Sequence, residues 1–139
     1  MQVSREIDYG VRAVVVMAAN ESRVLSKRII AEEFGIPVNF LAIILPKLVH
    51  SGIVESLPGP RGGYRLARPS ARISILDVIH AVNRGFALNR CDDGEKSCEQ
   101  RHRCPVAPYW KKLQGDVELF LRGVTFETLA TDFVNGARA

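Results

Sequence analysis

The sequence contains no apolar stretch long enough to cross a bilayer. Its longest apolar runs, residues 11–19 and 40–45, fall well short of the roughly 20 residues that a transmembrane helix needs. The N-terminal segment MQVSREIDYG has no uninterrupted apolar core of the kind that a secretion signal carries. We therefore expect a cytoplasmic protein with no membrane association, whose thiols stay reduced.

Signatures of common enzyme classes are also missing. The chain has no C-x-x-C motif, no nucleotide-binding glycine motif and no recognisable order of a catalytic triad. Its 139 residues, 47% of them hydrophobic, can form one small domain with a modest core, which dimerisation or a metal often supplements. We expect no enzymatic activity. Because the chain has three cysteines, a small thiol oxidoreductase is the enzyme class that remains as an alternative.

Acidic residues are absent between Glu55 and Asp77, where four arginines occur. Residues 1–75 contain ten Lys and Arg against six Asp and Glu, a net charge of +4, whereas residues 76–139 contain nine of each. The basic half suggests a polyanion such as nucleic acid as a partner. Chance clustering on a solvated surface explains the same charges.

The N-terminal half has the pattern of a helix-turn-helix. Residues 4–19 carry apolar side chains at helical spacing, with Gly10 at a place that suits a close packing contact. A second helix starts after Ser26, a typical N-cap, and ends at Gly35; a third starts near Pro37. Such a pair fits a helix-turn-helix, whose second helix enters the DNA major groove, or an ordinary helical hairpin.

A hairpin pattern follows directly, and this favours the helix-turn-helix. Two strand-like runs, Ile53-Val54 and Tyr64-Arg65-Leu66, flank the turn-forming segment PGPRGG. Together they predict a winged helix. Arg61 at the tip of the wing can enter a narrow minor groove, or it is a solvated turn arginine. We expect contacts to DNA phosphates from Ser26, Lys27 and Arg28, to a base edge from Asn39, to the minor groove from Arg61, and added positive charge from Lys47.

Pro46 lies inside the third predicted helix. A proline there removes one backbone hydrogen bond and costs about 3 kcal/mol in isolation. The pattern gives no reason for it, and we expect it to bend the helix or to end it early.

Helical patterns continue toward the C-terminus. Ser74 and Asp77 form a capping box for a fourth helix. From Pro105 a longer helix carries a continuous apolar seam, and a last helix covers residues 125–135. A chain this short has little left to cover the seam. We therefore expect the long helix to pair with its copy in a two-fold homodimer, which suits a palindromic DNA operator.

The expected fold is mainly α with a small β wing. A winged helix-turn-helix DNA-binding domain occupies residues 1–85. The cysteine loop and the dimerisation helices occupy residues 86–139.

All three cysteines of the chain, Cys91, Cys98 and Cys104, lie in one polar segment. Their C-x6-C and C-x5-C spacing fits structural zinc poorly, because zinc sites usually contain C-x2-C pairs. It allows three thiolates to converge on a larger object such as an iron–sulfur cluster. A thiol–disulfide switch, a single reactive cysteine and chance clustering are the other interpretations.

The sequence resembles the Rrf-two family of bacterial winged-helix regulators over nearly its whole length. The most specific parts are the wing GPRGGYRLARP, the segment ISILDVIHAV, and the three cysteines followed by PVAPYW. The resemblance implies a dimer joined by the long helix, a cytoplasmic location, control of promoters, and an iron–sulfur cluster near that helix.

Two departures from the family pattern bear on function. IscR-like members have a histidine as fourth cluster ligand where this chain has Ala107, whereas NsrR-like members use an aspartate of the partner subunit, and Asp8 matches it. Asp8 could equally complement its helix dipole, and His102 is closer in sequence. An oxygen ligand favours 4Fe–4S over 2Fe–2S. The second departure is in the third helix, where Ala42 replaces an acid that restricts base choice in IscR-like members.

The sequence thus predicts a transcriptional regulator whose operator binding is controlled by an iron–sulfur cluster that senses iron, redox state or nitric oxide. The alternative is a winged-helix regulator without a cluster. Such a protein would sense oxidants by thiol–disulfide chemistry or bind a partner protein.

Overall fold

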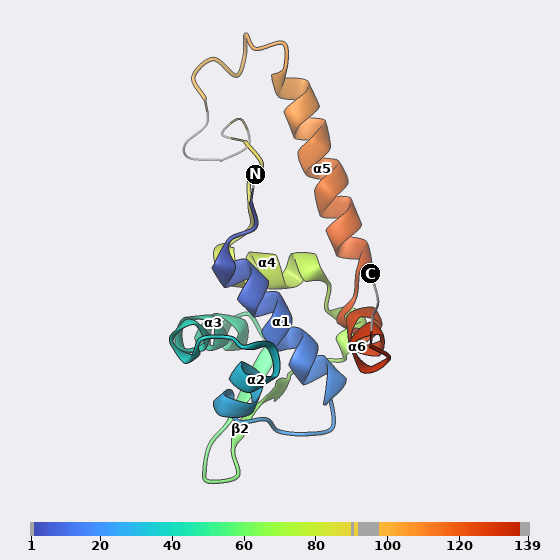
Figure 1. Ribbon diagram of the computed structural model, residues 1–139. Coiled ribbons are helices and arrows are strands. Elements are labelled where there is room, and N and C mark those ends of the chain that lie inside the picture. The colour runs from blue at the N-terminus through green and yellow to red at the C-terminus, as the bar shows by residue number, and fades with distance from the viewer. Residues whose placement is uncertain (1, 90, 92–97, 137–139) are drawn as a thin grey trace.

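Helices make up most of the chain, with a single two-stranded sheet among the residues that can be placed (Figure 1). The computed structural model describes residues 2–89, 91 and 98–136. Its elements are α1 (Arg5–Ala19), α2 (Lys27–Phe34), α3 (Val38–His50), β1 (Val54–Leu57), β2 (Gly63–Leu66), the 3-10 helix η1 (Ser70–Arg72), α4 (Ile75–Asn83), α5 (Ala107–Gly123) and α6 (Phe126–Val134). The predicted class, mainly α with a small β wing, is confirmed.

Local capping chemistry explains where these helices begin. The hydroxyls of Ser4, Ser26 and Thr125 accept hydrogen bonds from backbone N–H groups three residues on, and Ser74 and Asp77 form the expected capping box. Gly35 ends α2 in the left-handed conformation, with φ of 61°. The sequence therefore sets these boundaries before any tertiary contact forms.

Helix α1 is the centre of the hydrophobic core. It packs on α2, α3, α4 and α6, and its Ala13 and Val14 are fully buried. Gly10 lets α4 approach closely, since a Cβ at that position would lie 2.9 Å from Cγ2 of Val82. The expectation of a close contact at Gly10 is confirmed.

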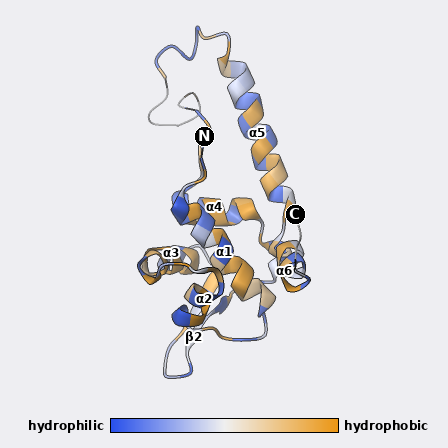
Figure 2. Ribbon diagram, viewed as in Figure 1, coloured by the Kyte–Doolittle hydropathy of each residue, from blue (hydrophilic) through white to orange (hydrophobic). Residues whose placement is uncertain are grey.

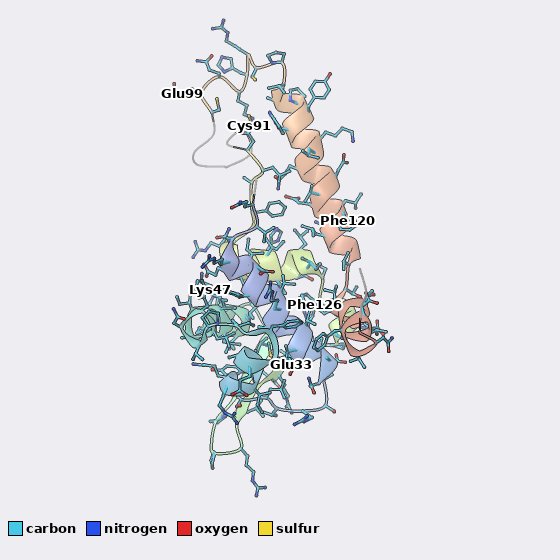
Figure 3. The ribbon with its side chains drawn as sticks, viewed as in Figure 1. Glu33, Lys47, Cys91, Glu99, Phe120 and Phe126 are labelled. Atoms are coloured by element: carbon cyan, nitrogen blue, oxygen red, sulfur yellow. The ribbon has the colours of Figure 1, made fainter. Side chains whose placement is uncertain are left out.

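Helix α6 shares this core. Its Phe126 is fully buried, and Figure 3 shows this side chain beside α1. The sequence grouped residues 126–134 with the cysteine loop and the dimerisation helix. The boundary at residue 85 stays a prediction, but α6 packs with the DNA-binding elements.

Pro46 does not end α3, which continues to His50. Pro46 and Ala42 are both exposed, one turn apart on the same face of the helix. Because Pro46 has no N–H, the carbonyl of Ala42 loses its usual helical donor. Both residues lie on the exposed side of α3 and not in the dry core, which limits the cost of the missing bond.

Helix α5 projects away from the core (Figure 1). Several large apolar side chains on it are uncovered in the single chain, and Figure 2 shows hydrophobic patches along its length. They are Tyr109, Leu113, Leu119 and Phe120. Within the described residues, no single helix is long and apolar enough to span a bilayer; only α2 and α3 taken together reach that length and composition, as a pair bent by 117°.

Phe126→Ala should lower the free energy of unfolding by about 3–5 kcal/mol, because it removes a fully buried aromatic ring from the α1–α6 contact. Urea denaturation followed by circular dichroism measures the change. Val134→Ala on the same helix is the control, since Val134 is exposed and its truncation should cost less than about 0.5 kcal/mol. Equal effects of the two substitutions would contradict the assignment of α6 to the core.

Candidate nucleic-acid interface and cysteine site

The wing is attached directly to the start of α2. Strands β1 and β2 pair antiparallel, with Glu55 opposite Arg65. Tyr64 on β2 also exchanges both backbone hydrogen bonds with Leu25, at 2.8 and 2.9 Å. Gly63 permits this approach, since a Cβ there would lie 2.3 Å from the carbonyl oxygen of Leu25. The wing and the N-terminus of α2 therefore form one rigid unit.

Arg61 lies exposed in the turn of this wing. The turn is closed by a 3.0 Å hydrogen bond from the N–H of Gly62 to the carbonyl of Gly59. Arg65 on the neighbouring strand pairs with Glu55. Arg61 makes no ion pair with any carboxylate in the described part of the chain, so its charge is available to a partner.

The other residues that are predicted to contact DNA differ in their surroundings. Ser26 is occupied as a helix cap, with Lys27 half-buried beside it. Arg28 is exposed and pairs with Glu32 on the next turn at 3.1 Å, an interaction that is weak in solvent. Asn39 is exposed on the first turn of α3. These four residues stay candidates, and none is buried away from a partner.

Lys47 is engaged within the chain. Its ammonium forms an ion pair with Glu6 of α1 and donates to the carbonyl of Val82 at the end of α4, at 3.0 Å. It therefore links α3, the second helix of the helix-turn-helix, to α1 and α4; Figure 3 labels Lys47 on α3. Its predicted role in adding charge at DNA stays untested, but its contacts favour a structural role. Sequence patterns carry no signal for this role, because Glu6 lies 41 residues away from Lys47.

Cys91 and Cys104 line one cavity at the N-terminal end of α5, with a volume of about 270 Å³. Cys91 is buried and Cys104 half-buried. His102 and Lys111 line the same cavity. Cys98 is exposed and lies outside it, and residues 92–97 of the intervening loop are outside the described residues.

The donor chemistry suits an iron–sulfur cluster, because thiolates are its usual ligands. The geometry in the single chain is incomplete. Across residues 2–89, 91 and 98–136, no three side chains of His, Cys, Asp or Glu lie close enough to hold a metal ion. The structure brings together two of the three predicted cysteines and an imidazole.

Asp8 lies away from the cysteines of its own chain. Its carboxylate pairs with Arg12 at 2.9 Å. It lines a second and largely apolar cavity of about 600 Å³ between α1, α4 and α5. Phe86 and Leu88, which precede the cysteine loop, line that cavity too. Asp8 is therefore near the stem of the loop and not near its thiols.

Gln114 connects this stem to α5, a role that sequence reasoning missed. Its buried amide donates to the carbonyl of Phe86 and to Glu118, and its oxygen accepts from the N–H of Leu88, all at 2.8 Å. The side chain thus mimics a strand partner for the segment that leads to Cys91. A single glutamine in an apolar helical seam carries no signal for a contact 26 residues away.

The fold and these sites define a winged helix-turn-helix transcriptional regulator. A family profile described as "Rrf2: Iron-dependent Transcriptional regulator" matches residues 3–132. The chain therefore belongs to the Rrf2 family of DNA-binding transcriptional regulators, and the sequence resemblance to that family is confirmed.

Individual relatives are similar to this chain over most of its length. Protein aau3 of Rhizobium meliloti is 31% identical over 93% of this chain and 84% of its own length. The HTH-type transcriptional regulator IscR of Vibrio cholerae is 36% identical over 74% of this chain and 59% of its own length.

Two solved structures show the same fold. The T. potens IscR matches all of this chain and 93% of its own, with a TM-score of 0.80 at 24% identity. CymR, the global cysteine regulator of B. subtilis, matches 94% of this chain and 97% of its own, with a TM-score of 0.76 at 22% identity. At these identities the likeness shows the fold alone, and it does not choose between a cluster and thiol chemistry.

Gln114→Leu should release the stem of the cysteine loop. It leaves the half-buried N–H of Leu88 and carbonyl of Phe86 without their partner, at a cost of about 1 kcal/mol for each group. Hydrogen exchange of the Leu88 amide should accelerate at least about tenfold. Lys112→Leu, an exposed position on the same helix, serves as the control. Unchanged exchange at Leu88 in the Gln114 variant would contradict the clamp.

Proposed function

We propose that this protein is a homodimeric, cytoplasmic regulator whose binding to a palindromic operator is controlled by an iron–sulfur cluster on Cys91, Cys98 and Cys104. The observation that carries the proposal is the convergence of Cys91 and Cys104 on one cavity. This cavity lies at the N-terminal end of α5, the helix that projects from the DNA-binding core (Figure 1). When bound, the cluster supplies a centre that gains or loses electrons or iron.

The chain's own residues provide the link from this site to DNA. The stem after α4 runs past Asp8 of α1 and is clamped to α5 by Gln114. Lys47 then ties the ends of α1 and α4 to α3. A change in the cysteine loop can therefore shift the stem, and the stem contacts helices that position the recognition helix.

The fourth ligand has two candidates with different support. His102 lines the cavity with Cys91 and Cys104. Asp8 matches the aspartate of NsrR-like members and would come from the partner subunit, which makes 4Fe–4S the expected cluster type. Exposed apolar residues along α5, Phe120 among them at 70% exposure, support pairing with a second copy.

A thiol switch without a cluster is the second candidate. Its support is that Cys91 and Cys104 line the same cavity, where an oxidant can reach both thiols. The structural neighbour titled as a global cysteine regulator has the same fold.

Anaerobic purification separates these functions. Wild-type protein should be brown, with bound iron and sulfide, and Cys91→Ser and Cys104→Ser should lose the visible absorption. If Asp8 is the fourth ligand, Asp8→Ala changes the spectrum and His102→Ala leaves it unchanged. If His102 is the fourth ligand, His102→Ala changes the spectrum and Asp8→Ala leaves it unchanged. DNA affinity measured on the same samples should differ between cluster-loaded and cluster-free protein. A colourless protein that forms a disulfide on oxidation would contradict the cluster and support the thiol switch.

At the wing, Arg61→Ala should weaken operator binding and reduce the slope of log affinity against log salt by about 1, because one phosphate-proximal charge is lost. Fluorescence anisotropy over a salt series measures both. Arg65→Ala is the matched control on the same wing, since Arg65 already pairs with Glu55. Equal salt slopes for wild type and Arg61→Ala would remove Arg61 from the interface.

A further inference from the structure

The outward face of α3 is almost entirely apolar. Val38 and Ile43 are each 55% exposed, and Ala42 and Pro46 are exposed as well. Helical spacing places these four residues and Asn39 on one side of the helix. Asn39 is the polar side chain of that face in its first two turns, His50 follows at its C-terminal end, and α3 contains no acidic residue at all.

This face is additional to the face that α3 contributes to the core. Leu41, Ile44, Leu45 and Leu48 are fully buried on the inner side, and Figure 2 shows hydrophobic colour along α3. A helix with apolar residues on its outer as well as its inner face is normally covered on both sides. In the described part of this chain, no element packs over the outer face, so a partner is the natural cover.

The positive charges on the neighbouring elements indicate that the partner that covers this face is a polyanion. Lys27 and Arg28 begin the preceding helix, and Arg61 lies on the adjoining wing. The exposed apolar residues of α5, the expected dimer surface, lie elsewhere: Figure 1 places α3 and α6 on opposite sides of α1, with α5 joined to α6. An apolar stripe on one helix, with cations on the preceding helix and on the wing, suits a DNA groove, with charges for the phosphates and apolar atoms for the bases.

We propose that Val38, Ala42 and Ile43 read thymine methyl groups, so that the operator half-site contains thymines where α3 contacts base edges. The C5-methyl of thymine is the apolar group that base pairs display in the major groove. Aliphatic side chains against guanine or cytosine edges would instead strip polar groups of water and offer no hydrogen bond in return. Asn39 supplies the one amide, which suits the adenine of an A·T pair.

This inference rests on the proposed docking of α3 in the major groove and not on the cluster. It also explains what the replacement of an acid by Ala42 does. A carboxylate at residue 42 would accept from a cytosine amino group and would lose its hydration against a methyl group, whereas the methyl of Ala42 packs on it without that cost. The chain's recognition helix is therefore built for methyl contact over its first two turns.

The test begins with the full-length dimeric protein and a pool of random-sequence DNA duplexes. Sites are selected with whichever of the cluster-loaded and cluster-free forms binds duplex more tightly. Each selected thymine is then replaced by deoxyuridine, which lacks only the methyl group. At contacted positions the affinity should fall about fourfold for each methyl, the factor that corresponds to about 0.8 kcal/mol for a buried methylene-sized group.

Ile43→Ala identifies the side chain responsible. In this variant the penalty for deoxyuridine should shrink toward onefold at one position and persist at the others, while the salt dependence stays unchanged. Val134→Ala, an exposed aliphatic truncation on α6, should leave every penalty as in the wild type.

Three outcomes would overturn the proposal, and they are distinguishable. Selected sites that bind tightly but tolerate deoxyuridine at every position within twofold overturn the methyl contacts and leave DNA binding intact. A change of oligomeric state in Ile43→Ala, without a change in DNA affinity, assigns the face to contact between copies. Absence of any selected site in either form overturns the proposed function together with this inference.

Discussion

The meeting of α1, α3 and α4 at Gly10 is the constraint on which the rest of the structure depends. A Cβ at Gly10 would collide with Val82 of α4 and would lie in van der Waals contact with Ile44 of α3, 3.6 Å away. Beside this contact Lys47 links α3 to Glu6 of α1 and to the carbonyl of Val82 in α4. The recognition helix therefore has no independent position, because its base is fixed by the two helices nearest the cysteine stem.

This arrangement connects the segment that leads to the cysteines with the helices that hold α3. The stem from Phe86 to Leu88 lines a cavity with α1 and α4 on one side and is bound by Gln114 of α5 on the other. It is therefore held between the helix expected to join two subunits and the helices that hold α3. Wing and α2 move as a unit with this core, because Leu25 and Tyr64 share backbone hydrogen bonds.

Local chemistry made most of the fold predictable. Serine caps, the capping box at Ser74 and the left-handed Gly35 act over three or four residues, and the helices begin and end where those signals predict. The contacts that set function act over long separations. Lys47 reaches Glu6 across 41 residues and Gln114 reaches Phe86 across 28, and periodicity cannot report such pairs. The cysteine spacing predicted that three thiolates converge; Cys91 and Cys104 line one cavity, and the convergence of all three stays a prediction. The cluster ligands and the DNA contacts depend on molecules other than this chain, and they stay predictions.

Pro46 has a consequence for how this regulator can change its preference for DNA. Its missing N–H removes the usual helical donor to the carbonyl of Ala42, a residue on the exposed face of α3. This loss is an effect of the main chain, so no substitution at Ala42 reverses it. Only a substitution at Pro46, one turn away, restores the helical donor. Two neighbouring positions thus control separate parts of the same surface, and mutation can alter its apolar and polar components independently.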